Sequence, residues 1–455
     1  MTVESRHKGF YRELLHLAFP IALQSFLLAA VSASDTIMLG RLNQNAMSAV
    51  SYASMVQFVQ NMLLMVITGA GMILGAQYFG KGDMDAIKAL RNIMLRLGIA
   101  SSLVFFSLCM FLPEPVMDIF TDDPDLIRIG GEYLRYAAIS YLLTGVSQVY
   151  LTMMKIMKRP GISARISAIA VGLNIVINYA LIFGFGPIQA IGVPGAAIAT
   201  AISRVVELAL AMLYSKHEGS LADRLNAVKK RHSTLSRDYL KVSLPLLGGI
   251  FVWGIGITVY SVIMGRLGPD VAAARSVAYV IRDLMCCTSI GTSAASGIMV
   301  GNALGSGDLK EGRACGERLM RIALVIGLIS CALVLAVMPL APHLVVLSDQ
   351  AKAYLNIMMI TIAVYMIARS SNEVVINGIF AAGGDTLFNV YSLAVCMWGI
   401  AIPLSALGAF VFHWPFWVVN ICTCLGEVVK IPWVLAHYKK YKWVRNLTRH
   451  NVCEA

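Results

Sequence analysis

The chain has 455 residues, of which 58% are hydrophobic and only 14% are charged, and its formal net charge is +12. Soluble domains are on average about 45–50% apolar and about 25% charged, so this composition argues against a soluble fold. The basic residues fall in short clusters between apolar runs, which is typical of the cytoplasmic flanks of membrane helices, and we expect no nucleic-acid partner.

Apolar runs of about 20 residues, the length that crosses a bilayer as a helix, recur along nearly the whole sequence. In chain order they predict twelve spans, near residues 14–40, 48–78, 92–112, 128–156, 163–185, 191–214, 239–265, 272–302, 318–340, 350–381, 389–412 and 415–437. Met1–Arg12 is polar and basic, and no small-residue cleavage site follows it, so no removable signal peptide is expected. We therefore predict an all-α integral membrane protein surrounded by lipid.

Basic residues assign a side of the membrane to the connections between these spans. They gather in every second connection: Arg6–Arg12, Lys81–Arg91, Lys155–Arg159, Lys216–Lys241, Arg313–Arg318 and Lys439–Arg449. Connections rich in Lys and Arg stay in the cytoplasm, whereas the connection at Pro113–Pro124 is acidic and fits the outer face. Both termini are therefore predicted to be cytoplasmic, in a multi-pass protein of the inner (plasma) membrane.

An internal repeat divides the chain into two similar halves. A shift of 225 positions without gaps superposes Leu17–Pro20 on Val242–Pro245 and Gly80–Asp83 on Gly305–Asp308. This register predicts two six-helix lobes in the same orientation, with a substrate path between them. The expected boundaries are an amino-terminal lobe at 1–214, a cytoplasmic linker at 215–238, a carboxy-terminal lobe at 239–440 and a cytoplasmic tail at 441–455.

Four polar residues of the first half need an explanation, because ionisable and polar groups are costly in hydrocarbon. Asp35 has no Lys or Arg within a helical turn, and it is either a functional acid or an acid near the outer helix end that meets water. Asn174 and Asn178 lie on one helix face, where they can hold a cation or a carboxylate, or link two helices. Thr200 follows small residues that permit close helix packing.

Charged residues inside other spans lie beside opposite charges. The pairs are Arg204–Glu207, Arg282–Asp283, Arg369–Glu373 and Glu427–Lys430. Each can be satisfied within one helix, and the first and last pairs, near cytoplasmic ends, are expected to be structural. Asp283 and Glu373 lie nearer the middle of their helices and are candidates for a second protonation site.

Several of these segments, taken together, resemble the multidrug and toxic compound extrusion family. They are Phe19-Pro20, Asp35-Thr-Ile-Met-Leu-Gly-Arg-Leu42, Asn174 with Asn178, Gly192-Val-Pro-Gly-Ala-Ala-Ile-Ala-Thr200, Ile376-Asn-Gly-Ile-Phe-Ala-Ala-Gly-Gly-Asp-Thr386, Glu427–Lys430 and Lys442–Thr448. The resemblance covers essentially the whole chain. It depends on the order and spacing of the motifs, since no single motif is decisive.

The resemblance implies a V-shaped pair of six-helix lobes that exports amphipathic organic cations in exchange for H+ or Na+. It implies an ion-coupling pocket of Asp35, Asn174 and Thr200, with Asn178 where some members carry a second Asp. Other members use a Glu and an Asp in the second lobe, at positions that Trp253 and Ser370 occupy here. We expect a monomer without a cofactor other than the coupling ion.

Methionine and aromatic side chains are predicted to form a loose cavity for the organic cation, since thioethers and π faces accept many ligands. The candidates are Met62, Met65, Trp253, Tyr260 and Tyr279. Ordinary packing in the core or against lipid is the alternative for each of them.

The mechanistic hypothesis is that Asp35 alternates between an ion-bound or protonated state and a substrate-competent state. A helix bend near Pro20 would accompany the change, since proline removes one backbone hydrogen bond. A proton needs only Asp35, whereas Na+ prefers several oxygens and more than one negative charge. H+ coupling is therefore favoured, and Na+ at Asp35 stays open.

Two other functional classes fit the sequence less well. A flippase for a lipid-linked precursor needs several Arg or Lys to hold a pyrophosphate, and only Arg282 and Arg369 are candidates, both beside acids. A membrane enzyme needs a cluster of His, Asp or Glu at metal spacing, or a Ser/His pair, and the sequence has neither. The nine scattered cysteines predict neither a metal site nor a disulfide framework.

Overall fold

The computed structural model describes residues 3–40, 44–185, 189–215, 233–343 and 347–448. Among these residues, twelve helices are long and apolar enough to cross a membrane, which confirms the twelve predicted spans. Most of the predicted linker, residues 216–232, and the last residues of the predicted tail, 449–455, lie outside the described residues.

The chain forms two compact units. The N-terminal unit combines Gln24–Gly75 with Met84–Tyr239, and the C-terminal unit combines Met1–Leu23, Ala76–Asp83 and Leu240–Arg449. Helices α1 and α2 therefore contribute to both units. The lobe boundaries derived from the sequence, and the V-shaped cleft between the lobes, stay predictions.

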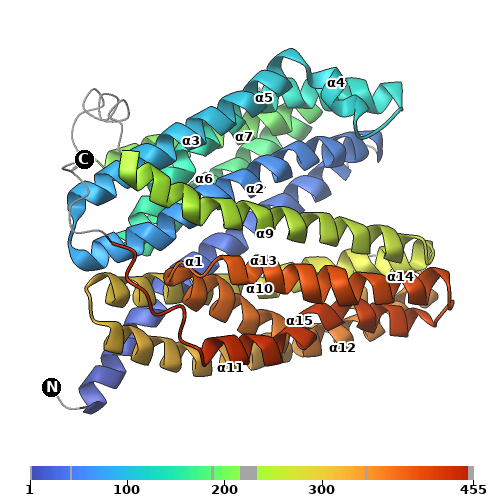
Figure 1. Ribbon diagram of the computed structural model, residues 1–455. Helices are drawn as coiled ribbons and strands as arrows, with labels where there is room; N and C mark the ends of the chain where they lie inside the picture. The colour runs from blue at the N-terminus through green and yellow to red at the C-terminus, as the bar shows by residue number, and fades with distance from the viewer. Residues whose placement is uncertain (1–2, 41–43, 186–188, 216–232, 344–346, 449–455) are drawn as a thin grey trace. The chain divides into compact units, whose positions relative to one another are not determined.

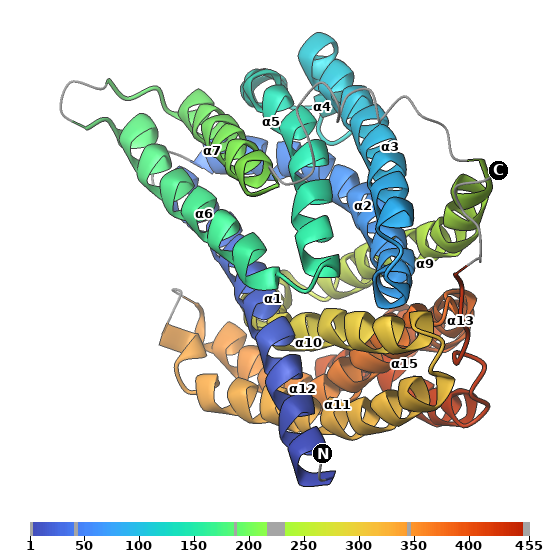
Figure 2. The ribbon, with the colours of Figure 1, turned by 90° about the vertical axis from the view of Figure 1, so that its left-hand side faces the viewer.

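The N-terminal unit is built from long helices that lie side by side (Figures 1 and 2). They are α1 (Val3–Gly40), α2 (Gln44–Lys81), α3 (Met84–Phe111), the short α4 (Pro113–Asp118), α5 (Pro124–Ile156), α6 (Pro160–Phe183) and α7 (Val193–Tyr214). Helices α4, α5 and α6 begin with proline, which fits the first turn because no intrahelical partner is needed there. Helix α5 packs against α3 and α7, and α7 packs against α6.

The C-terminal unit contains the remaining spans and two π-helical segments. Its elements are α9 (Ser233–Gly265), α10 (Pro269–Gly305), α11 (Leu309–Val337), the 3-10 turn η2 (Ala341–His343), α12 (Asp349–Asn372), the π-helix η3 (Glu373–Phe380), α13 (Leu387–Leu393), the π-helix η4 (Ala394–Ala401), α14 (Ile402–Phe410) and α15 (Phe416–Tyr438). Helices α12 and η3 form one span, and α13, η4 and α14 form another.

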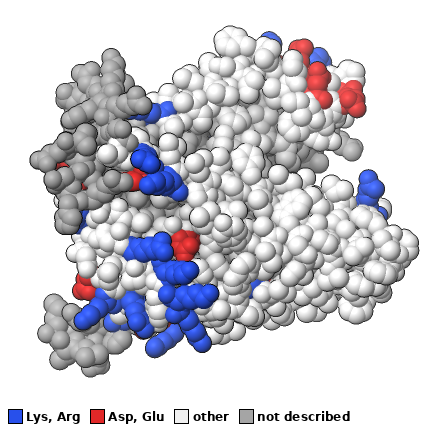
Figure 3. All heavy atoms as spheres, viewed as in Figure 1, with Lys and Arg blue, Asp and Glu red and all other residues white. Residues whose placement is uncertain are grey.

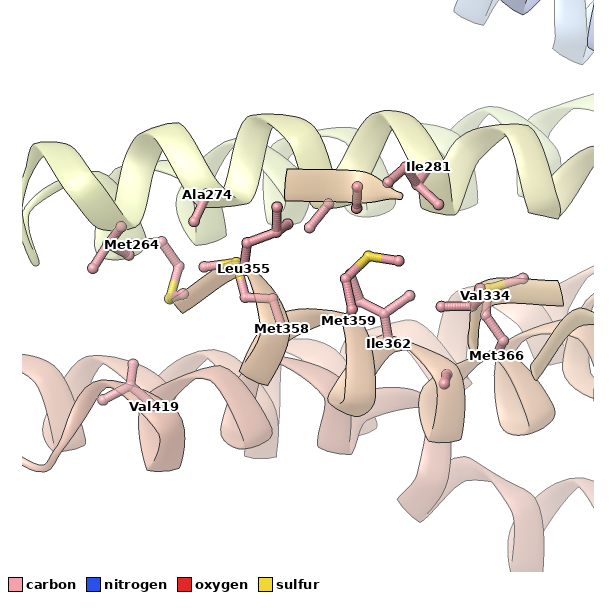
Figure 4. Close-up of a cluster of buried hydrophobic side chains, with 14 of the residues drawn as sticks. Met264, Ala274, Ile281, Val334, Leu355, Met358, Met359, Ile362, Met366 and Val419 are labelled. Atoms are coloured by element: carbon pink, nitrogen blue, oxygen red, sulfur yellow. The ribbon is translucent and has the colours of Figure 1, made fainter. Parts of the chain in front are cut away.

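The core of the C-terminal unit is rich in methionine. Met264, Met358, Met359 and Met366 are buried around Leu355, between α9, α10 and α12 (Figure 4). Unbranched thioether side chains fill irregular gaps, so these methionines can fill the space between the helices.

The internal repeat is visible as a reciprocal contact within the C-terminal unit. A Cβ on Gly80 would overlap the carbonyl oxygen of Asn302, and a Cβ on Gly305 would overlap the carbonyl oxygen of Gln77. Gly80 and Gly305 are repeat equivalents, and so are Gln77 and Asn302. The ends of α2 and α10 therefore meet through the same two positions of each half, as in a two-fold symmetric interface.

Helix α1 continues through Pro20 and packs closely against α10 (Figure 2). A Cβ on Gly291 would lie 2.6 Å from the carbonyl oxygen of Ala18 and 2.6 Å from Cβ of Ala22. Glycine is therefore needed on α10 at the level of Pro20. The predicted bend of α1 at this proline stays a prediction.

The first part of the C-terminal tail packs against the C-terminal unit. Trp443 is fully buried, and the Nε2 atom of Gln77 donates hydrogen bonds to the carbonyl oxygens of Ala382 (2.7 Å) and Arg445 (3.1 Å). The backbone N–H of Leu447 donates to Oε1 of the same glutamine at 2.6 Å. Lys and Arg side chains of this unit gather at the same end, where α11 begins and α15 ends (Figure 3).

Candidate functional site

Helix α6 presents two buried amides on one face. It runs from Pro160 to Phe183 and buries Asn174 and Asn178 one turn apart. Gly184, with a φ of 84°, follows its last residue. Residues at i and i+4 lie above one another on a helix, so the sequence spacing explains why the two amides lie on the same face. A positive φ favours glycine, which explains the residue at the helix end.

Small residues bring α7 close to α6. A Cβ on Gly195 would lie 2.8 Å from the carbonyl oxygen of Leu181, and the next residues, Ala196 and Ala197, are buried. Close approach through small residues is typical of helix pairs in membranes. It places the Thr200 hydroxyl within reach of the amides on α6.

The structure brings together Asp35, Asn174, Asn178 and Thr200, the four residues selected from the sequence. The Nδ2 atom of Asn178 donates hydrogen bonds to Oδ1 of Asp35 at 2.6 Å and to Oδ1 of Asn174 at 3.1 Å. The Nδ2 atom of Asn174 donates to Oγ1 of Thr200 at 3.3 Å, and Thr200 donates to the carbonyl oxygen of Ala196. One hydrogen-bonded chain therefore links α1, α6 and α7.

The oxygen atoms of this chain can serve a proton or a monovalent cation. Within the described part of the chain, Oδ1 of Asn178 is buried and has no hydrogen-bond partner, so one acceptor beside Asp35 is unused. Among all residues that the structure describes, no group of three or more His, Cys, Asp or Glu could hold a metal ion. The roles of these residues stay a prediction.

Asp35 lies in the wall of a cavity of about 660 Å³ within the N-terminal unit. Residues from α1, α2, α5, α6 and α7 line this cavity. The lining includes apolar and aromatic side chains: Leu28, Met47, Met55, Phe58, Met65 and Tyr133. Met65 was predicted to lie in a substrate cavity, whereas Met62 is buried and is not among the lining residues.

A charged pair on α7 also lines the cavity, although the sequence indicated only a structural role for it. Nη1 of Arg204 lies 2.8 Å from Oε2 of Glu207, and the Ser147 hydroxyl donates to the same oxygen at 2.9 Å. Spacing in the sequence reveals the pair, but it does not reveal the side of α7 that faces the cavity. Ser147 was not predicted, since an isolated serine in an apolar span carries no signal.

The candidate acids of the C-terminal unit are both paired. Arg369 donates to Oε2 of Glu373, and Nδ2 of Asn377 donates to Oε1 of Glu373 at 3.0 Å. Asp283 accepts from its neighbour Arg282 at 2.7 Å. Glu373 is the first residue of the π-helix η3, and π-helical turns are frequent at functional sites. A second protonation site at Asp283 or Glu373 stays a prediction.

The aromatic candidates of the C-terminal unit lie in two different surroundings. Tyr260 is buried in an apolar cluster against which Trp253 packs. The ring of Tyr279 lies between the guanidinium groups of Arg275 and Arg282, each 3.9 Å from the ring centre. Their contact with a substrate stays a prediction.

The family model MatE matches the chain twice, at residues 20–180 and 245–407. The two matches begin at Pro20 and Pro245, which the internal repeat superposes. A protein named "Uncharacterized transporter YisQ" from Bacillus subtilis is 25% identical over 90% of this chain and 89% of its own length. A protein named "Probable multidrug resistance protein NorM" from Mesorhizobium japonicum is 25% identical over 95% of this chain and 93% of its own length.

Solved structures show the same fold. A MOP superfamily transporter from Pyrococcus furiosus superposes with a TM-score of 0.85 at 16% identity, over 94% of this chain and 95% of the other. The MATE transporter VcmN of Vibrio cholerae, in its bent form, superposes with a TM-score of 0.82 at 15% identity, over 97% of this chain and 98% of the other.

Proposed function

Because the chain belongs to the MatE family of multidrug and toxic compound extrusion transporters, we propose that it is an antiporter that exports amphipathic organic cations in exchange for H+. The family consists of membrane transporters and is not a class of enzymes. The proposal concerns the substrate class and the coupling ion of this chain, and its alternating-access mechanism.

One observation carries the proposal: the carboxylate of Asp35, hydrogen-bonded by the neutral amide of Asn178, lies in the wall of a cavity that is lined mainly by apolar, thioether and neutral polar groups. A negative charge among such groups attracts an organic cation without selecting one shape. Removal of that charge by protonation removes the attraction. One group therefore serves both the ion and the substrate, which is the minimal requirement for exchange.

Asn178 suits both protonation states of Asp35. Its Nδ2 atom donates to the carboxylate at 2.6 Å, and its buried Oδ1 atom has no partner among the described residues. An amide offers two donors and an acceptor, so rotation of the side chain would let Oδ1 accept a hydrogen bond from protonated Asp35. Neither state would then leave the carboxyl group without a partner.

The transport cycle follows from differential binding. Protonation of Asp35 from the outside would favour a state with low affinity for the organic cation, and release of the proton inside would restore the affinity. A bend of α1 near Pro20 would accompany the change, since proline already lacks one backbone hydrogen bond. Na+ is the second candidate ion, because the free oxygen of Asn178 lies beside Asp35.

A flippase for a lipid-linked precursor is not favoured by the cavity. Its one arginine among the described lining residues, Arg204, forms an ion pair with Glu207. A pyrophosphate group needs several unpaired cationic donors, and this wall does not supply them.

The experiment is efflux of a fluorescent organic cation, ethidium, from proteoliposomes under one imposed gradient at a time. With H+ coupling, a pH gradient drives efflux in Na+-free medium, a protonophore abolishes it, and replacement of Na+ by choline has no effect. Strict Na+ dependence with indifference to the protonophore, at fixed membrane potential, would contradict H+ coupling. Efflux that ignores both gradients would contradict ion-coupled antiport.

A further inference from the structure

Three charged residues are found among the described residues that line the cavity of the N-terminal unit: Asp35, Arg204 and Glu207. Arg204 and Glu207 follow Thr200 by four and seven residues on α7, so these three side chains lie on one helix face. The charged pair thus faces the same cavity as Asp35, the proposed coupling carboxylate.

Glu207 is a buried carboxylate that accepts hydrogen bonds on one of its two oxygens. Its side chain is 1% exposed, and Oε2 accepts hydrogen bonds from Arg204 at 2.8 Å and from Ser147 at 2.9 Å. Oε1 is buried without a hydrogen-bond partner among the described residues. Lys155, in the last turn of α5, interacts electrostatically with Glu207 but does not line the cavity. On the cavity side, Glu207 is therefore compensated by Arg204.

Arg204 interacts electrostatically with two acids. Its ion pair is with Glu207, and its charge also acts on Asp35. Asp35 itself is held by the neutral amide of Asn178 and lies near Tyr133. A buried acid that loses its ionic partner becomes an uncompensated negative charge. Such a charge on a cavity wall attracts a cation into the cavity.

We propose that Arg204 is a specificity-determining residue, because its ion pair with Glu207 leaves Asp35 as the one uncompensated carboxylate on the described wall of the cavity. This inference rests on the proposed function. With the pair intact, the charges on the wall sum to one negative charge when Asp35 is ionised and to zero when it is protonated. Without Arg204, Glu207 would offer a second negative charge, and a cation would be bound after Asp35 has lost its charge.

The decisive test moves the negative charge from Asp35 to Glu207. Binding of radiolabelled tetraphenylphosphonium, a monovalent lipophilic cation, is measured by equilibrium dialysis on the full-length protein in detergent. Asp35→Asn should weaken binding by about tenfold or more, because a unit charge at short range is lost. Adding Arg204→Met should restore binding by about tenfold, and adding Glu207→Gln to this double variant should abolish the restored binding.

Methionine replaces arginine in this test because it keeps an unbranched side chain of similar length without the charge. Each variant must elute as a single species and keep a melting temperature close to that of Asp35→Asn. If the folded Asp35→Asn/Arg204→Met protein binds no better than Asp35→Asn, Arg204 does not mask Glu207 and the proposal is overturned.

A single variant tests the same pair without altering Asp35. Glu207→Gln leaves Arg204 as an uncompensated cation on the cavity wall and should weaken tetraphenylphosphonium binding by about tenfold. Adding Arg204→Met should recover most of this loss. Unchanged binding in Glu207→Gln would contradict the inference. Wild-type binding in Asp35→Asn would instead contradict the proposed role of Asp35, and the inference would then be tested by Glu207→Gln alone.

Discussion

Asn178 makes the polar site of the N-terminal unit a one-carboxylate site. Its Nδ2 atom donates a hydrogen bond to Oδ1 of Asp35 at 2.6 Å, and its side chain is fully buried. A second acid here would place two carboxyl groups in contact. Two such groups share one proton or hold a cation between them, because both cannot be ionised without compensation.

Asn178→Asp is therefore expected to change the ion response of the transporter. The variant should show efflux that Na+ stimulates, because a second carboxylate supplies the charge that a Na+ site prefers. The measurement is ethidium efflux from proteoliposomes in Na+ and in choline medium. Asn178→Leu is the matched control, since it removes the hydrogen bond without adding a charge, and it should lose efflux in both media. Equal Na+ responses of Asn178→Asp and wild type would contradict this prediction.

At the residue scale, the sequence predicted the site because polar groups are rare in apolar spans. Asp35, Asn174, Asn178 and Thr200 stand out for that reason, and the structure brings them together. The cavity face of α7 could not be predicted in the same way. Arg204 and Glu207 have the spacing of an ordinary surface pair, and only packing against α5 shows which way they point.

At the scale of helices, glycine decides how closely neighbouring elements approach. Gly305 on α10 meets the backbone of Gln77 on α2, and there is no room for a Cβ between them. The clash would be with a backbone carbonyl, which cannot rotate away as a flexible side chain can. The contact therefore depends on the absence of a side chain.

Gly305→Ala is expected to destabilise the protein by about 1–3 kcal/mol, the usual range for overpacking a tight contact. The readout is the melting temperature of the purified protein in detergent. Gly172→Ala is the control, because Gly172 is exposed on α6 and a Cβ there would meet nothing within 4 Å. Equal melting temperatures of the two variants would contradict the close contact.

Some elements could not be predicted because they depend on tertiary contacts. The π-helical segments η3 and η4 interrupt two spans whose sequences look like ordinary apolar helices. The tail was predicted only as a cytoplasmic extension, yet Trp443 is fully buried and Gln77 binds the backbone on either side of residue 446. A polar, basic segment carries no periodic pattern that reveals such packing.

At the scale of the whole molecule, the number of spans was predictable because a bilayer imposes a fixed helix length. The repeat was predictable because a shift of 225 positions superposes motifs of the two halves, and basic residues mark the cytoplasmic face. Twelve described helices meet that length, and the family model matches each half separately. The same rule predicts that both termini lie in the cytoplasm.

The topology prediction can be measured directly in bacteria. Green fluorescent protein fused after Ala455 should fluoresce, because it folds in the cytoplasm, whereas alkaline phosphatase fused there should be inactive. A fusion after Asp123, in the acidic connection before α5, should give the opposite pair of signals. An active phosphatase after Ala455 would contradict the assignment of the C-terminus.

The central claim is that Asp35 couples an inward proton flux to outward movement of an organic cation. The most direct measurement is the pH inside proteoliposomes, reported by a trapped dye, when an outward gradient of tetraphenylphosphonium is imposed at clamped membrane potential. Wild type should acidify the lumen as the cation leaves, and Asp35→Asn should give only the signal of protein-free vesicles. Acidification by Asp35→Asn at the wild-type rate, or cation efflux by the wild type above that of protein-free vesicles without any pH change, would contradict the claim.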